Sequence, residues 1–226
     1  FTIADIAFMQ GIANTLAVAI ERSERDRELT DAREREGLFA AEMRHRVKNV
    51  FAVINGLISI SRREAGSDVD AFSTLISGRI IALSSATEAG LSQSTASDMD
   101  QNNFDPVALV HRVLKPYGNR IEISGTTEAI AQRYATPLAL VIHELATNAM
   151  KYGALSSAGS HIEIQWGTTS GQVSLYWREY SEPRSLKTLN SSGLGNRMID
   201  RMLASVDSKI EYSWEKRGLT AVIVLG

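Results

Sequence analysis

The chain has 226 residues, of which 44% are hydrophobic and 22% charged, a balance typical of a folded protein of one to three modules. Its formal net charge of −2 provides no general attraction to nucleic acid or to an anionic membrane, so we expect no nucleic-acid partner. The absence of cysteine excludes disulfides and thiolate metal sites and favours a reducing compartment, for which the cytoplasm is the simplest expectation.

The first stretch of the sequence predicts helices and no membrane span. No apolar run approaches the roughly 20 residues that cross a bilayer. The chain begins with Phe1 rather than Met, so we expect it to be part of a longer protein. Apolar residues recur every three or four positions between 6 and 20, which predicts an amphipathic helix. Nearly every residue from 24 to 36 is charged, which predicts a solvated helix that is either a spacer or a lever carrying a signal.

Helical periodicity returns between 38 and 63 and again after a turn at Gly66 and Ser67. His45 and Asn49 fall on the face of the first of these helices that is turned away from its apolar stripe. The stripe of the second helix consists of Phe72, Leu75, Ile76, Arg79, Ile80, Leu83 and Ala86. Such a hairpin has too little core by itself, so we expect it to complete a bundle by pairing with a second copy as a homodimer, with a monomer as the alternative that the sequence leaves open.

The rest of the sequence predicts a separate module after a linker rich in Ser, Asp and Asn at 93–103. Helices are predicted at 106–114, 137–152 and 196–204, and strands at 121–124, 161–166, 172–178, 209–214 and 219–225. Because helices are mixed with a mainly antiparallel sheet, we expect a two-layer α/β sandwich from 104 to 226. The fold class is therefore α+β, a helical hairpin followed by this sandwich.

Two polar arrangements in this module suit a nucleotide. Glu144, Asn148 and Lys151 are spaced by four and three residues, which places a carboxylate, an amide and an amine on one helix face. An amide oxygen suits Mg²⁺ and an ammonium suits phosphate, although a polar helix face is often only solvated. Gly193 and Gly195 precede a predicted helix, where free backbone amides bind phosphate oxygens or where a flexible loop simply ends in a cap.

Three segments together resemble the sensor histidine kinases of the HWE type over roughly residues 38–226. The first, residues 45–49 (His-Arg-Val-Lys-Asn), resembles the phosphoacceptor segment of that family. The second, residues 143–156, is similar to the family's N-box, and the third, Trp177-Arg178-Glu179, matches its Trp-x-Glu motif. Residues 1–22 resemble the closing helix of a GAF sensor domain. These resemblances divide the chain into a sensor-helix end and linker (1–37), a dimerisation and phosphoacceptor hairpin (38–92) and an ATP-binding domain of the GHKL type (104–226).

The resemblance implies a bacterial two-component enzyme that uses ATP and Mg²⁺. In this interpretation ATP phosphorylates His45, and the phosphoryl group then passes to an aspartate in the receiver domain of a response regulator. Glu144 would polarise or deprotonate His45, and Asn148 would hold Mg²⁺. The residues implied in nucleotide binding are His143, Asn148, Lys151, Tyr152, Glu179, Gly193 and Gly195.

One departure from the family pattern keeps a second function open. The family usually follows its Trp-x-Glu motif with a Gly-Gly-Pro-like turn, whereas this chain has Ser181 and Glu182 before Pro183. These residues reduce backbone freedom and add a carboxylate near the expected nucleotide pocket. The alternatives are therefore a non-catalytic signalling scaffold that retains the fold, and an ATPase that hydrolyses rather than transfers.

Overall fold

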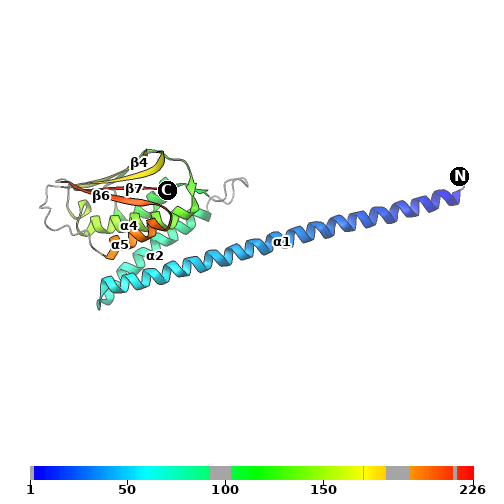
Figure 1. Ribbon diagram of the computed structural model, residues 1–226, viewed down its shortest axis with the longest axis horizontal. Coiled ribbons are helices and arrows are strands. Elements are labelled where there is room, and N and C mark those ends of the chain that lie inside the picture. The colour runs from blue at the N-terminus through cyan, green and yellow to red at the C-terminus, as the bar shows by residue number, and fades with distance from the viewer. Residues whose placement is uncertain (1–2, 92–102, 170, 182–193, 216–217) are drawn as a thin grey trace. The chain divides into compact units, whose positions relative to one another are not determined.

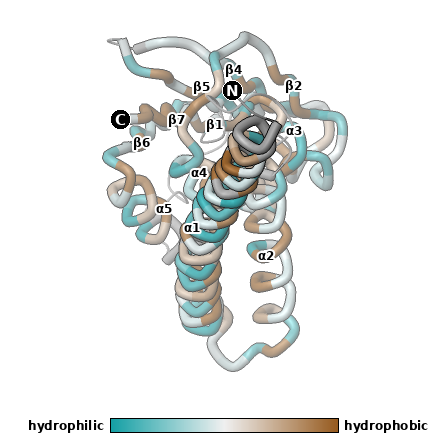
Figure 2. Tube along the Cα trace, turned by 90° about the vertical axis from the view of Figure 1, so that its right-hand side faces the viewer, coloured by the Kyte–Doolittle hydropathy of each residue, from teal (hydrophilic) through white to brown (hydrophobic). Residues whose placement is uncertain are grey.

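The computed structural model describes residues 3–91, 103–169, 171–181, 194–215 and 218–226. Contacts within the chain define two compact units, residues 1–55 and residues 56–226. The first unit is helical and belongs to α1 (Ile3–Ala65), a helix of 63 residues whose last ten residues belong to the second unit. Hydrophobic and hydrophilic residues alternate along the turns of α1 (Figure 2).

The second unit combines the end of α1 and α2 (Val69–Leu91) with an α/β domain. The domain contains β1 (Asn103–Phe104), α3 (Pro106–Leu114), β2 (Ile121–Ser124), β3 (Ile130–Ala131), α4 (Ala135–Lys151), β4 (His161–Thr169), β5 (Gln172–Tyr180), α5 (Leu194–Ala204), β6 (Lys209–Glu215) and β7 (Gly218–Val224). Short 3₁₀ helices lie at Lys115–Tyr117, Gln132–Tyr134 and Ala154–Ser156. Helices and strands thus alternate in the manner of a two-layer domain.

The five-stranded sheet has the order β2-β4-β5-β7-β6. β2 pairs parallel with β4, and the other neighbours pair antiparallel. Helices α4 and α5 lie on one face of this sheet (Figure 1). Side chains alternate along β5, so that Leu175 and Trp177 are fully buried on the helix side. The core therefore lies between the sheet and the helices that carry the predicted N-box.

The local sequence explains where α3 begins and how the chain turns between α1 and α2. Asp105 caps α3, since its carboxylate accepts from the backbone N–H groups of Val107 at 2.8 Å and Ala108 at 3.2 Å, and Pro106 occupies the first turn. Gly66 adopts a φ of 62° in the turn between α1 and α2, a conformation that glycine takes without steric cost.

The predicted fold class is confirmed, with differences in detail. The helices predicted at 6–20, 24–36 and 38–63 are one continuous helix, because the charged stretch has good helix formers and no breaker. The short pair β1 and β3 was not predicted, since two-residue strands carry no periodicity. The predicted linker at 93–103 lies almost wholly outside the described residues.

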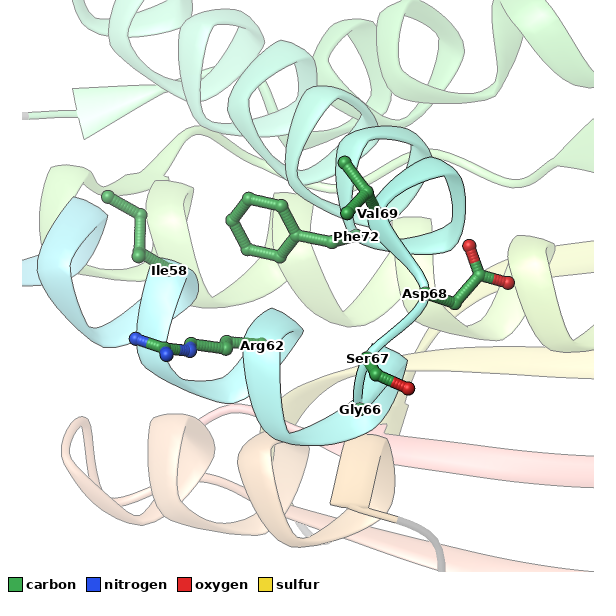
Figure 3. Close-up of a pocket in the computed structure, with 7 residues that line it drawn as sticks. All are labelled: Ile58, Arg62, Gly66, Ser67, Asp68, Val69 and Phe72. Atoms are coloured by element: carbon green, nitrogen blue, oxygen red, sulfur yellow. The ribbon is translucent and has the colours of Figure 1, made fainter.

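A surface pocket of about 340 Å³ lies at the turn between α1 and α2. Ile58 and Arg62 of α1 and Val69 and Phe72 of α2 line it, as Figure 3 shows. None of the predicted site residues lines this pocket. Within the described parts of the chain, no helix is long and apolar enough to cross a membrane.

Candidate functional site

His45, the predicted phosphoacceptor, is exposed on α1 in the unit formed by residues 1–55. The side chain of Asn49, one turn later, places its amide nitrogen 3.4 Å from His45 Nδ1. Residues four apart on a helix are neighbours on one face, so this contact follows from the His-Arg-x-x-Asn spacing. An exposed imidazole with one ring nitrogen held by a neighbour has its other nitrogen accessible to a reactant.

The remaining predicted residues belong to the unit formed by residues 56–226. Asn148 lies half-buried near the end of α4, while Lys151 and Tyr152 are exposed at its C-terminal end. Among the residues that the structure describes, the side chains of Asn148 and Lys151 make no hydrogen bond or ion pair. An unengaged amide oxygen and an ammonium one turn apart fit the ligand set that Mg²⁺ and phosphate require. The chemistry of these residues therefore suits a magnesium nucleotide.

Glu144 has a different environment, because a buried arginine from α2 binds it. Arg79 Nε lies 2.7 Å from Glu144 Oε1, and Arg79 Nη2 lies 3.1 Å from Glu144 Oε2. The same guanidinium reaches Ser61 Oγ at 2.7 Å and Glu64 Oε2 at 2.7 Å, both at the end of α1. Arg79 is fully buried and Glu144 is 5% exposed. One side chain thus joins α1, α2 and α4.

The electrostatics of this cluster depend on the ion pairs. Burial by itself lowers the pKa of Arg79, but the hydrogen bonds and charges of Glu144 and Glu64 outweigh burial and raise it. A bidentate contact of this kind is the strong form of an arginine–carboxylate pair. Removing one partner of a buried pair typically costs about 3–5 kcal/mol, because the other charge stays buried without compensation.

His143, the residue before Glu144, packs between α2 and the 3₁₀ helix that follows α3. The Tyr117 hydroxyl lies 2.6 Å from His143 Nδ1 and 3.2 Å from Thr147 Oγ1. On the other side lies Gly78 of α2, where an added Cβ would be 2.7 Å from His143 Cε1. The glycine therefore permits the close approach of the two helices. In this structure His143 contributes to helix packing, and its implied role at the nucleotide remains a prediction.

The burial of His143 predicts a loss of stability in mild acid. Burial lowers its pKa below the usual value, the Glu144 charge opposes this, and the charges of Arg79 and Lys151 reinforce it. His143 therefore binds a proton more readily in the unfolded chain than in the folded one. Its contribution to the free energy of unfolding is fully present above about pH 6.5, and it is lost as the pH falls from there through the pKa of His143 in the folded chain. Denaturant titrations from pH 7.5 to 5 should show this loss.

The control for this expectation is the same substitution at an exposed histidine. His143→Asn should flatten the stability profile between pH 6.5 and 5, whereas His111→Asn, at an exposed position of α3, should retain it. A profile that is equally steep in both variants would contradict the assignment to His143.

Glu179 of the Trp-x-Glu motif connects β5 to the end of the N-box. Its Oε2 accepts from the backbone N–H of Ala154 at 2.8 Å, and its Oε1 accepts from the Trp177 indole at 3.2 Å. Glu179 is 7% exposed, and Gly153 packs so closely against its carboxylate that a Cβ there would overlap it. The motif therefore fixes the loop after α4, beside the predicted magnesium and phosphate ligands.

The glycine loop and the altered turn are described only in part. Gly195 lies in the first turn of α5, whereas Gly193 and Glu182 lie outside the described residues. Ser181 is half-buried just after β5. Asp207 adopts a φ of 54°, a left-handed conformation that favours glycine, in the turn between α5 and β6.

Sequence reasoning missed Gly78, Arg79 and Tyr117. The signal for Arg79 was present, because an arginine within an apolar helical stripe must be buried with a partner or leave the stripe. A glycine in a helix interior was a second signal, since it weakens the helix unless close packing requires it.

Comparison with known proteins identifies a matching family and several relatives. Residues 42–127 match the family described as HWE histidine kinase. The chain is 40% identical over 196 residues to Blue-light-activated histidine kinase 1 of Erythrobacter litoralis, covering 82% of this chain and 52% of that protein. It is 28% identical over 215 residues to the Blue-light-activated histidine kinase of Brucella ovis, covering 91% of this chain and 42% of the relative. The chain thus spans about half the length of the curated relatives it matches.

The fold has a counterpart among solved structures. The histidine kinase domain of a blue-light-activated histidine kinase from Erythrobacter litoralis superposes with a TM-score of 0.58 at 18% identity. The match covers 77% of this chain and 84% of that domain. The chain therefore carries an HWE histidine kinase family domain at residues 42–127 and is a homologue of blue-light-activated histidine kinases.

Proposed function

We propose that this chain is the core of a sensor histidine kinase that transfers the γ-phosphoryl group of ATP to His45 and then to an aspartate of a response regulator. The observation that carries the proposal is the exposure of His45 beside Asn49, on a chain whose other unit has the fold of kinase domains. An exposed acceptor is accessible in turn to a nucleotide-bound domain and to a receiver domain.

The proposed chemistry starts from neutral imidazole. The Asn49 amide nitrogen donates to Nδ1 of His45, which leaves the proton of the neutral ring on Nε2. Glu144 polarises the imidazole or accepts this proton, and Nε2 attacks the γ-phosphorus as the bond to the departing ADP oxygen breaks. Transfer of this kind depends on in-line positioning and charge neutralisation.

The residues of α4 and of the following loop would hold the nucleotide. Asn148 offers an amide oxygen to Mg²⁺, which when bound neutralises charge on the phosphates, and Lys151 offers an ammonium to the phosphates themselves. Glu179 would recognise the base while it fixes Gly153 and Ala154. Gly193 and Gly195 would supply backbone amides to phosphate oxygens at the start of α5.

We further propose that the chain forms a homodimer through its hairpin. Large apolar side chains are exposed on α1, at Val47 and Phe51, and on α2, at Ile80 and Ile81. Burying such side chains against a second copy would complete a helical bundle.

The test of the proposed function is labelling from γ-labelled ATP with Mg²⁺. The natural sequence should acquire an acid-labile label, and His45→Ala should reduce it to background while Mg²⁺-dependent nucleotide binding persists. His111→Ala, which removes another exposed histidine, serves as the matched control and should label normally. Label that persists in His45→Ala would contradict the proposal, and phosphate release undiminished in that variant would favour an ATPase.

A further inference from the structure

In the contact between α2 and α4, two adjacent residues of one helix meet two adjacent residues of the other. Gly78 allows α2 to approach the ring of His143, and Arg79 engages Glu144 through two hydrogen bonds. All four residues lie in the compact unit 56–226. The dipeptide His143-Glu144 of the N-box is therefore bound by the dipeptide Gly78-Arg79.

This contact occupies the carboxylate that the proposed reaction requires. Both oxygens of Glu144 face the guanidinium, and the side chain is 5% exposed. A carboxylate in that position is unavailable as a base or polariser for His45. We propose that Gly78 and Arg79 form a latch on Glu144, with Arg79 as its positioning residue, and that autophosphorylation follows the opening of this latch. The inference rests on the proposed function.

The chemistry of the latch suits reversible opening. Apolar side chains of similar volume would hold two helices at least as firmly as a buried ion pair does. An ion pair, unlike an apolar contact, regains hydration on both partners when the helices separate. Arg79 also neutralises Glu64, so its loss would leave two carboxylates facing each other across the contact without a cation. Loss of this cation therefore favours the open state.

The test uses two variants that open the same contact by different means. Arg79→Met removes the guanidinium but keeps an unbranched side chain. Gly78→Ala leaves every charge in place and drives a methyl group against His143. The matched controls are Arg63→Met, at an exposed arginine of α1, and Gly56→Ala, where an added Cβ meets nothing within 4 Å.

Two measurements on the whole chain test whether the latch has opened and whether the reaction has become faster. Amide hydrogen exchange over residues 72–86 of α2 reports opening without reference to activity, and the initial rate of labelling from γ-labelled ATP reports the reaction. Both latch variants should lose protection in α2 and label faster, by roughly tenfold for Arg79→Met, with the KM for ATP unchanged. Arg79→Lys, which keeps the charge but loses the bidentate contact, should fall between the natural sequence and Arg79→Met. Both controls should match the natural sequence.

Results that contradict the latch can be distinguished from results that contradict the proposed function. If the natural chain is labelled and the latch variants bind ATP but are labelled at an equal or lower rate, the latch is overturned and the proposed function stands. If α2 loses protection and no protein acquires label, the proposed function is overturned and the latch falls with it. Should Arg79→Met fail to bind ATP because it does not fold, Gly78→Ala decides, since it retains all the charged groups.

Discussion

Replacing Asn148 with alanine will remove Mg²⁺-dependent ATP binding while leaving the fold intact. The Asn148 side chain is half-buried on α4 and makes no hydrogen bond among the described residues, so its removal breaks no hydrogen bond of the described α/β domain. Loss of a residue that only orients a metal ligand typically weakens metal binding about 10- to 100-fold. Loss of the proposed ligand itself should weaken ATP binding by roughly 100-fold. Calorimetric titration with and without Mg²⁺ measures this effect.

The control tests whether the effect is specific to Asn148. Asn119 is exposed near the start of β2, and the Asn119→Ala variant should bind ATP like the natural sequence. In Asn148→Ala, titrations in Mg²⁺ and in EDTA should give the same weak affinity, and the free energy of unfolding should change by no more than about 0.5 kcal/mol. Tight Mg²⁺-dependent binding by Asn148→Ala would show that this residue is not the ligand.

The second large effect is expected at Glu179. Glu179→Ala leaves two buried donors without an acceptor, the backbone N–H of Ala154 and the indole N–H of Trp177. Each buried donor that loses its partner costs about 1–3 kcal/mol, so the loss of both should lower the free energy of unfolding by roughly 2–6 kcal/mol. ATP binding should weaken as well, because Glu179 fixes the loop that follows Asn148. Denaturant unfolding and nucleotide titration measure the two effects.

Two further substitutions sharpen this expectation. Glu179→Gln retains one carbonyl acceptor and should lose less stability than Glu179→Ala. Glu211→Ala removes a glutamate that is 65% exposed on β6, and should change stability by less than about 0.5 kcal/mol. A Glu179→Ala variant as stable as Glu211→Ala would mean that the hydrogen bonds to Ala154 and Trp177 do not fix the loop.

Most elements of the α/β domain were predictable because their signals are local. Asp105 followed by Pro106 marks the start of α3, and the structure begins this helix at the predicted residue. The alternation of apolar residues in β4 and β5 likewise placed both strands, since one side of the sheet faces the helices. The ends of these strands were placed less well, because Gly167, Thr168 and Glu179 pair in the ladder although none of them has a large apolar side chain.

The environment of Glu144 was not predictable from its own helix. Spacing placed Glu144 with Asn148 and Lys151 on one polar face, and a polar face is usually solvated. In the structure α2 covers this face at Glu144 but not at Lys151, which is exposed. The partner, Arg79, lies 65 residues earlier in the sequence, and no local pattern specifies a contact at that separation.

The departure at Ser181 and Glu182 determines whether the scaffold alternative survives. Ser181 lies half-buried directly after β5, whose residue Glu179 is the proposed base-recognising side chain. Saturable Mg²⁺-dependent nucleotide binding by the natural sequence would remove the scaffold alternative, and its absence would favour that alternative.

The most direct measurement is the location of the phosphoryl group. The chain has four histidines, of which His45 is exposed on α1 and His143 is packed against Gly78 and Tyr117. After incubation with ATP and Mg²⁺, mass spectrometry at neutral to alkaline pH should find the group on the peptide that contains His45. A phosphoryl group on any other residue, or none on a chain that binds Mg²⁺ and ATP, would contradict the account.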